Sequence, residues 1–367
     1  MTVKILDLTG TPYERGLQHG SALEQNIAAN IQTYRNRFLL GGASADRIDT
    51  EARNWSEKLQ QHDAEYFEEM TGIADGANVD IAEISMLNAR YELSYTLYTT
   101  EAAAANNVPS HEPEGCTAFG IQPEYTSNGH TIIGQNWDWL EGLLGNICLL
   151  RVRSDEHPDY MLLTQAGIVS GMFGFNEHGI GLCVNGLSSK GDGEELHHRP
   201  FHMRVRDIMR STTLFDALKV IFATDRVCST NWLIAQKGGE VLDIESSGKV
   251  THTLYPADGL ITHGNHFINR TGIESDFERI APCSLYRTPR LDRLIRQNSQ
   301  KWDMDHLKDC LKDSFGFPKA ICRYANPNDP IEARTVTVTS VIMDLDNLSM
   351  EITDGPPDTA AYSSFSL

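Results

Sequence analysis

The stretch Glu114-Gly115-Cys116-Thr117-Ala118-Phe119-Gly120 marks the point where the sequence changes from helical to β character. Upstream of it, apolar residues recur at helical intervals in three segments, residues 20–37, 44–77 and 81–97. Residues 100–114 are rich in alanine, asparagine and proline, which predicts an exposed connector. We therefore expect a helical first part and a β-rich second part that begins at Cys116.

Short apolar runs separated by turn residues follow Cys116 and predict strands. The expected strands are residues 116–121, 130–135, 147–152, 160–165, 171–176, 179–187, 231–236, 240–246 and 335–344. Helices are expected at residues 201–209, 214–224, 290–297 and 304–312. Strands with helices before and between them predict a layered α/β (α+β) fold with antiparallel sheets.

The composition excludes some classes of partner. The 367 residues include 31 Lys and Arg against 50 Asp and Glu, a net charge of −19, which argues against binding nucleic acid or anionic membranes. No long apolar run and no basic, apolar leader is found. The seven cysteines include no Cys-x-x-Cys pair, so free thiols are expected. These features predict a cytoplasmic globular protein.

Metal and cofactor motifs are missing from the sequence. His197, His198 and His202 cluster, but they follow a polar loop and lack the His-Glu-x-x-His spacing of a zinc helix. The glycines of residues 171–176 do not form a Gly-x-Gly-x-x-Gly fingerprint that opens a helix. We therefore expect neither a metal nor a cofactor.

Cys116 has two interpretations: a buried free thiol at a strand start, or a nucleophile. Gly115 leaves the preceding carbonyl open to attack by the Cys116 thiol, and the polar connector resembles a cleavable segment. Cleavage of the Gly115–Cys116 bond would give Cys116 an α-amino group. With a pKa near 8, that group could act as a general base for its own thiol.

A carboxylate is needed to hold this amine, and Asp138 is the candidate. Asn128-Gly129 predicts a hairpin turn, and a turn centred there places Cys116 opposite Glu141. Asp138 would then lie on the neighbouring strand, displaced by about three residues, or roughly 10 Å. A bulge near Pro123 would shorten that separation.

Four segments resemble the isopenicillin-N acyltransferase family, a branch of the N-terminal-nucleophile hydrolases. They are Gly10-Thr-Pro-Tyr-Glu-Arg-Gly-Leu-Gln-His-Gly-Ser21, Glu83-Ile-Ser-Met-Leu-Asn-Ala-Arg-Tyr-Glu92, Gly115-Cys116-Thr117 and Gly134-Gln-Asn-Trp-Asp-Trp139. The last two together are the most specific, because the family has a Gly-Cys-Thr processing site and a Gly-Gln-Asn-Trp-Asp strand.

The resemblance implies a precursor that cleaves itself before Cys116. Its products would be a helical α chain of residues 1–115 and a β chain of residues 116–367, which remain associated as a heterodimer. It also implies a four-layer αββα fold. The enzyme would be an autoproteolytic cysteine amidase or acyltransferase that acts on the amide of a small N-acyl substrate through an acyl-enzyme.

The resemblance assigns further site residues. Asn265, in His263-Gly264-Asn265-His266, matches an asparagine that donates to the oxyanion, although it could also be a turn residue. Asn185 lies where relatives supply a second oxyanion contact, or else it belongs to an Asn-Gly turn. Arg334 matches an arginine near the active site that could pair with Asp138 or with a substrate carboxylate, or else it is a surface residue.

Trp137 and Trp139 alternate with Asp138 and either line an apolar acyl pocket or belong to the core. Two other functions stay open. One is a conventional Cys–His thiol peptidase that uses His263 or His266 without self-cleavage. The other is a catalytically silent binding protein with the same fold.

Overall fold

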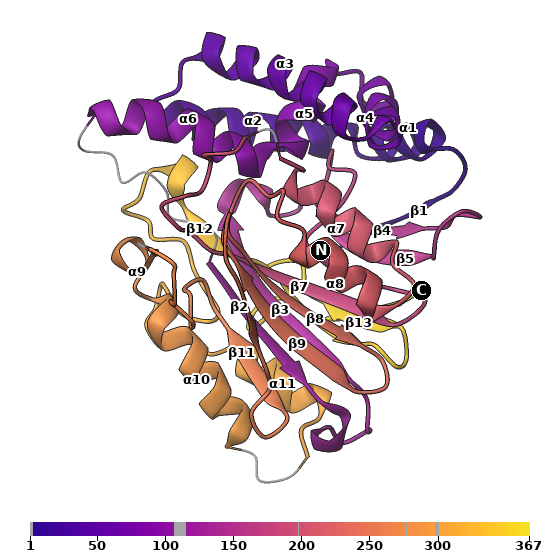
Figure 1. Cartoon of the computed structure of the whole chain (residues 1–367), viewed down its shortest axis with the longest axis vertical. Coiled ribbons are helices and arrows are strands. Elements are labelled where there is room, and N and C mark those ends of the chain that lie inside the picture. The colour runs from indigo at the N-terminus through magenta and orange to yellow at the C-terminus, as the bar shows by residue number, and fades with distance from the viewer. Residues whose placement is uncertain (1–2, 106–114, 197, 276, 298–300) are drawn as a thin grey trace.

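The N-terminal part of the chain is a layer of helices above the sheets (Figure 1). The computed structural model describes residues 3–105, 115–196, 198–275, 277–297 and 301–367. The N-terminal helices are α1 (Pro12–Ala22), α2 (Glu24–Leu40), α3 (Ala45–His62), α4 (Ala64–Ala77), α5 (Ile81–Asn88) and α6 (Arg90–Ala105). Asp80 caps α5, because its side chain accepts from the backbone N–H of Ala82.

Two sheets form the centre of the molecule. The eight-stranded sheet has the order β1 (Lys4–Leu8), β4 (Ile147–Val152), β5 (Tyr160–Gln165), β6 (Phe173–Asn176), β7 (Ile180–Gly186), β8 (Thr230–Gln236), β9 (Glu240–Ser246) and β10 (Thr251–Leu254). The six-stranded sheet has the order β11 (Leu260–His263), β2 (Gly115–Ile121), β3 (Ile132–Leu140), β12 (Thr335–Asp344), β13 (Ser349–Ile352) and β14 (Ser363–Ser366).

The sheets pack face to face, with helices on both outer sides (Figure 1). β2 contacts β7, β8 and β9 of the opposite sheet. The helices of the second half are α7 (Phe201–Met209), α8 (Leu214–Phe222), α9 (Phe277–Ile280), α10 (Ser284–Arg296) and α11 (Met304–Leu311). α7 and α8 contact the eight-stranded sheet, and α10 and α11 contact the six-stranded sheet. The expected four-layer αββα architecture is confirmed.

Some expectations on local structure are wrong. α6 continues to Ala105, so residues 100–105 are helical, while residues 106–114 of the expected connector lie outside the described residues. β1 was not predicted, and it pairs in parallel with β4, so the N-terminal part supplies a strand as well as helices. The other unpredicted strands are β10, β11, β13 and β14, each of four residues. Runs this short carry little periodicity.

The register between β2 and β3 differs from the prediction, and the difference matters for the site. Gly115 pairs with Asp138 and Cys116 with Trp137, so the expected pairing of Cys116 with Glu141 is wrong. The connection is not a tight turn on Asn128-Gly129, because β2 ends at Ile121, β3 begins at Ile132, and a 3₁₀ turn lies between them. Because this connection is not a tight turn on Asn128-Gly129, the register shifts, and Asp138 pairs with Gly115, the residue next to Cys116.

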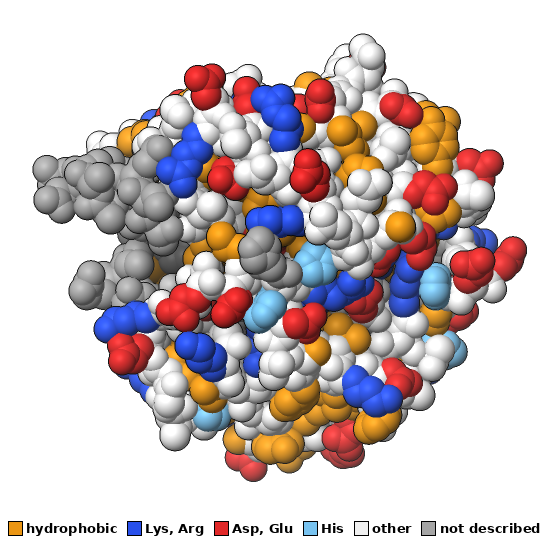
Figure 2. Space-filling view, turned by 45° about the horizontal axis from the view of Figure 1, so that its top comes forward, with side chains coloured by type: hydrophobic (Ala, Val, Ile, Leu, Met, Phe, Trp, Pro, Cys, Tyr) orange, Lys and Arg blue, Asp and Glu red, His pale blue; other side chains and the backbone are white. Residues whose placement is uncertain are grey.

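Acidic and basic side chains are interspersed over the face shown in Figure 2. Within the described part of the chain, no helix has both the length and the apolar character that crossing a bilayer requires.

Candidate active site

Cys116 is the second residue of β2 and is fully buried. Successive residues of a strand point to opposite faces. Cys116 and its partner Trp137 belong to the large core between the sheets. Gly115 and Asp138 therefore face the opposite side, toward α10 and the segment that carries Arg323.

Asp138 is held by two partners on that side. Its Oδ1 accepts from the Thr337 hydroxyl at 2.7 Å, and its Oδ2 lies 3.2 Å from the Arg323 Nε. Burial raises the pKa of Asp138 to about 6, because it outweighs the opposing charges of Arg323 and Arg287. The two arginines therefore offset only part of the cost of burying this carboxylate.

Gly115 is required by close packing against these groups. A Cβ at this position would lie 2.7 Å from the Arg323 Cζ and 3.0 Å from the Asp138 Oδ2. Arg323 has little freedom to move, because its backbone N–H donates to Thr337 and its Nη1 donates to Thr335. Glycine therefore lets the bond before Cys116 lie against the Asp138–Arg323 pair.

Asn265 joins the site through both ends of its amide. Its Oδ1 accepts from the Cys116 backbone N–H at 2.8 Å and from the Arg287 Nη2 at 2.8 Å. Its Nδ2 donates to the Gly186 carbonyl at 3.1 Å. Two donors on one end and an acceptor on the other fix the amide orientation. The second Nδ2 hydrogen is not needed for the Gly186 contact.

Arg287 was missed by the sequence analysis. It is fully buried in α10, and its Nη1 donates to the Cys116 carbonyl and the Thr117 hydroxyl, both at 2.6 Å. A signal was present: Arg287, Leu291 and Ile295 follow each other at intervals of four residues, so a charge lies on the apolar stripe of this helix. A buried charge at such a position needs specific partners.

Arg323, not Arg334, is the arginine paired with Asp138. The Arg334 side chain donates to the carbonyls of Asp329 and Pro327, and its Nη1 lies 3.8 Å from Glu141. The predicted pairing of Arg334 with Asp138 is therefore wrong, because the short turn before β12 directs its side chain elsewhere. A contact of Arg334 with a substrate carboxylate stays a prediction.

Asn185 lies in β7, directly before the Gly186 that contacts Asn265. Its Oδ1 accepts from the Asn231 Nδ2 at 3.1 Å. Its Nδ2 is buried and has no hydrogen-bond partner among the described residues. This free donor is compatible with the expected oxyanion contact, which stays a prediction.

The two tryptophans are packed into the structure. Trp137 is 1% exposed and meets Phe173 edge-on, with ring centroids 6.3 Å apart. The Trp139 Nε1 donates to the Tyr34 hydroxyl at 2.9 Å, which ties β3 to α2. These contacts are those of core residues, and a role in an acyl pocket stays a prediction for both.

His263 and His266 have other partners than a catalytic thiol. The His263 ring nitrogens lie 3.0 Å from the Gly264 carbonyl and 3.0 Å from the Glu245 Oε1. Both partners are acceptors, so both nitrogens carry protons. Burial opposes this charge, but Asp243 and Glu245 raise the pKa of His263 to about 9. A protonated imidazole cannot act as a base.

His266 differs from His263 in charge. Its Nδ1 lies 2.7 Å from the Ser284 hydroxyl, which itself accepts from the Asn265 backbone N–H. Burial and the neighbouring His263 charge lower the pKa of His266 to about 4. Through Ser284, the neutral His266 ring supports the turn that carries Asn265.

Cys283 is a second thiol near the site, and the sequence analysis did not single it out. The Arg323 Nη2 donates to its Sγ at 3.3 Å. Burial raises the pKa of Cys283, but the charges of Arg287 and Arg323 outweigh it and the net pKa is lowered.

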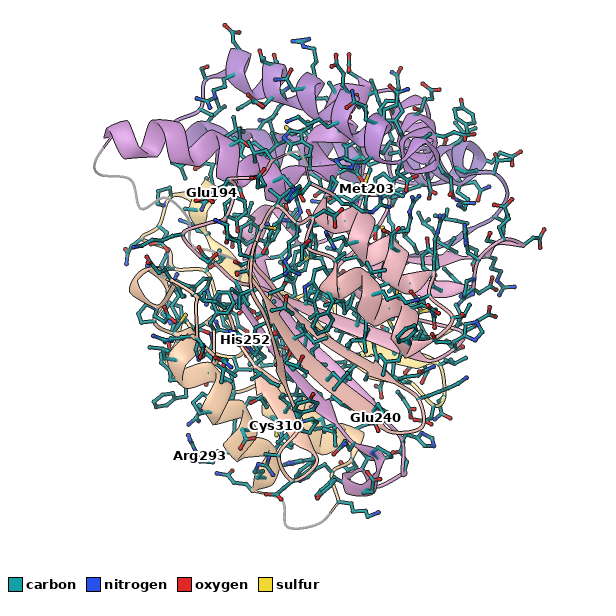
Figure 3. All side chains as sticks on the ribbon, viewed as in Figure 1. Glu194, Met203, Glu240, His252, Arg293 and Cys310 are labelled. Carbon is teal, nitrogen blue, oxygen red and sulfur yellow. The ribbon has the colours of Figure 1, made fainter. Side chains whose placement is uncertain are left out.

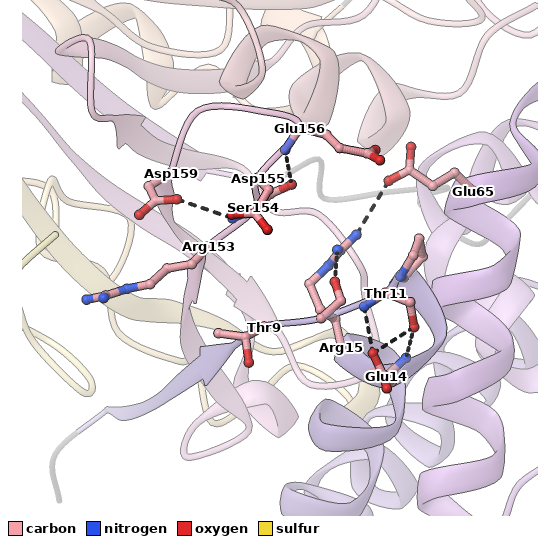
Figure 4. A pocket seen from close by; sticks show the side chains of 12 residues that line it. Thr9, Thr11, Glu14, Arg15, Glu65, Arg153, Ser154, Asp155, Glu156 and Asp159 are labelled. Carbon is pink, nitrogen blue, oxygen red and sulfur yellow. Dashed lines mark hydrogen bonds and ion pairs between the residues drawn. The ribbon is translucent and has the colours of Figure 1, made fainter.

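A cavity of about 600 Å³ lies elsewhere, between the start of α1, α4 and the β4–β5 loop (Figure 4). Within its lining, Arg15 donates to the Gly10 carbonyl and to Glu65. None of the predicted site residues lines it.

The described residues contain no group of three or more His, Cys, Asp or Glu side chains that could hold a metal. His202 contacts the Gly171 carbonyl through its Nδ1, His198 contacts the Arg226 carbonyl, and His197 lies outside the described residues.

Residues 125–358, more than half of the chain, match the family model described as acyl-coenzyme A:6-aminopenicillanic acid acyl-transferase. The chain belongs to this acyltransferase family. The match includes Asp138, Asn265 and Arg323 and begins after Cys116. The family resemblance in the sequence is thereby confirmed.

One relative of known sequence has the same acyltransferase description. The chain is 27% identical over 321 residues to the acyl-coenzyme A:6-aminopenicillanic-acid-acyltransferase 40 kDa form of Emericella nidulans, covering 86% of this chain and 83% of that protein. Among solved structures, it is similar to a Caenorhabditis elegans N-acylethanolamine-hydrolyzing acid amidase ortholog. That similarity has a TM-score of 0.48 and 16% identity, and it covers 63% of this chain and 93% of the other.

A penicillin V acylase from Agrobacterium tumefaciens matches with a TM-score of 0.43 and 12% identity, covering 69% of this chain and 86% of the other. The family membership supports an enzyme of the acyltransferase type.

Proposed function

We propose that this chain cleaves itself between Gly115 and Cys116 and then uses Cys116 to transfer the acyl group of a small N-acyl amide. The pairing of Gly115 with Asp138 carries the proposal, because it puts a buried carboxylate beside the bond that must break. The Cys116 N–H already donates to Asn265. The amine formed by cleavage would thus have two acceptors within reach.

Self-cleavage begins when the Cys116 thiolate attacks the Gly115 carbonyl carbon. The C–N bond breaks, the Cys116 nitrogen takes up a proton, and a thioester links Gly115 to the Cys116 sulfur. Water hydrolyses the thioester to the Gly115 carboxylate and the free thiol. Asp138 then holds the α-ammonium in its protonated state and orients the amine in its basic state.

Turnover repeats the same chemistry on a substrate. The Cys116 amine takes the thiol proton, the thiolate attacks the substrate carbonyl, and the proton passes to the leaving amine. Asn265, together with Asn185, stabilises the oxyanion through side-chain N–H groups. Water or an acceptor amine then releases the acyl group from Cys116.

Residues 1–115 would remain attached as an α chain after cleavage. Asn30 donates to the carbonyls of Asn146 and Ala166, and Asn88 donates to the Gly167 carbonyl. The buried His19 Nε2 accepts from the Gly167 N–H at 3.1 Å. These contacts and the β1–β4 pairing support a stable heterodimer with the β chain.

Intact-mass measurement and N-terminal sequencing of the purified protein test the proposal. Two fragments are expected, one of which begins at Cys116. A panel of N-acyl amines and N-acyl amino acids, with and without an acceptor amine, is then screened for release of free amine. A single uncleaved 40.9 kDa chain that turns over the panel would contradict self-processing.

The two other functions make different predictions. A Cys–His peptidase would stay active with Cys116 internal, but the protonated His263 gives that mechanism no support. A silent binding protein would show no selective iodoacetamide labelling of Cys116. Cys148 serves as the internal reference, because burial raises the pKa of its thiol to about 12.

A further inference from the structure

A buried ion pair links the two sheets beside the candidate site. His263, at the end of β11, belongs to the six-stranded sheet, and Glu245, in β9, belongs to the eight-stranded sheet. The His263 Nε2 lies 3.0 Å from the Glu245 Oε1, and both side chains are fully buried. Removing two charges from water costs free energy unless their hydrogen bonds are completed.

Glu245 completes those bonds with the turn that carries Asn265. Besides His263, its carboxylate accepts from the backbone N–H groups of Ile268 and Asn269. One carboxylate of the eight-stranded sheet thus binds His263 at the end of β11 and two residues of the turn that follows Asn265. The contacted residues flank Asn265, whose Oδ1 accepts from the Cys116 N–H.

The same strand also supports Asn185. Asp243 lies two residues before Glu245, and its Oδ1 accepts from the Asn231 Nδ2 at 2.6 Å. Asn231 Nδ2 also donates to the Asn185 Oδ1. This chain fixes the oxygen end of the Asn185 amide and leaves its Nδ2 as a buried donor with no partner among the described residues.

We propose that Glu245 and His263 form an intersheet clamp that positions Asn265 relative to Asn185. The inference rests on the proposed function and adds positioning residues to it. Because Asn265 follows β11 of one sheet and Asn185 lies in β7 of the other, a small shift between the sheets changes the distance between their donors. A misplacement of about 1 Å in an active site can cost about a hundredfold in rate.

The test compares Glu245→Gln with Glu240→Gln, which alters an exposed glutamate at the opposite end of β9 (Figure 3). Both proteins are assayed for kcat, KM and unfolding temperature. Glu245→Gln should lower kcat about 10- to 100-fold and change KM by less than about threefold, because the donors act on the transition state. Glu240→Gln should match the wild type.

A second variant separates positioning from stability. In Glu245→Gln/His263→Gln the buried charges are removed together, so the unfolding temperature should return to within a few degrees of the wild type. Its kcat should remain at least about tenfold low, because an amide cannot reproduce the three contacts of the carboxylate. This variant also tests the clamp if Glu245→Gln alone fails to fold.

Two results would overturn the clamp and leave the proposed function standing: unchanged kcat in Glu245→Gln, or kcat that recovers together with the unfolding temperature in the double variant. If the wild type is neither cleaved nor active on any N-acyl amide, the proposed function fails and the clamp fails with it.

Discussion

The hairpin of β2 and β3 presents two faces of opposite character at the bond before Cys116. On the face toward the other sheet, Cys116 and Trp137 are packed in the apolar core. On the face toward α10, Gly115 and Asp138 meet Arg323, a buried and charged group. Gly115 and Cys116 are neighbours in the sequence, and so are Trp137 and Asp138. Within each pair, the alternation of side chains along a strand places the two residues on opposite faces.

The difference suggests a division of roles in the proposed mechanism. The apolar face holds the Cys116 sulfur, and the charged face binds the new amine. Variants on the two faces should therefore lose activity in different ways.

Cys116→Ala should abolish both self-cleavage and turnover while the protein remains folded. The sulfur is the only group removed, and alanine fits the core position that cysteine leaves. Intact mass should give one full-length chain, and thermal unfolding should stay close to that of the wild type. Cys148→Ala, a control in the apolar core of β4, should be cleaved and active.

Arg323→Met and Arg334→Met form a matched pair for the charged face. Arg323→Met leaves Asp138 buried without its cation, which typically costs about 3–5 kcal/mol. Arg334 is partly exposed and 3.8 Å from Glu141, so its loss should cost about 1 kcal/mol or less. Denaturant unfolding measures both; equal losses would mean that Asp138 does not depend on Arg323.

Gly115→Ala should slow self-cleavage about tenfold, because the new Cβ would displace the Arg323 guanidinium from Asp138. The rate is followed by gel after expression in a cell-free system. Gly129→Ala is the comparison, since nothing lies within 4 Å of its Cβ position, although its φ of +75° adds some backbone strain. If the two variants are cleaved at the same rate, close packing at Gly115 is not what matters.

Below about pH 6 turnover should fall more steeply than protonation of the Cys116 amine alone predicts, because only ionised Asp138 can hold an ammonium. Burial raises this pKa from 3.8, so the folded state binds the proton more tightly than the unfolded state. This group's contribution to the unfolding free energy therefore increases as the pH falls from 6 to 4. Activity and unfolding temperature are measured over the same pH range. As the pH falls, the activity should decrease while the Asp138 contribution to stability increases.

Much of the fold could be predicted because its signals are local. The Asp80 cap, the strands at 147–152 and 160–165 and the helix at 201–209 all follow from patterns within a few residues. The register of Cys116 could not be predicted in this way, since it depends on how the residues between β2 and β3 are packed.

The change from helices to strands at Cys116 could be predicted from sequence alone, and the motifs pointed to Cys116, Asp138 and Asn265. The folded chain was needed to find that Arg323 instead of Arg334 pairs with Asp138, that Arg287 binds Asn265, and that Glu245 contacts His263 across the sheets. A local pattern sets the shape of one segment only. The partner of a buried charge is chosen by packing among segments that are far apart in the chain.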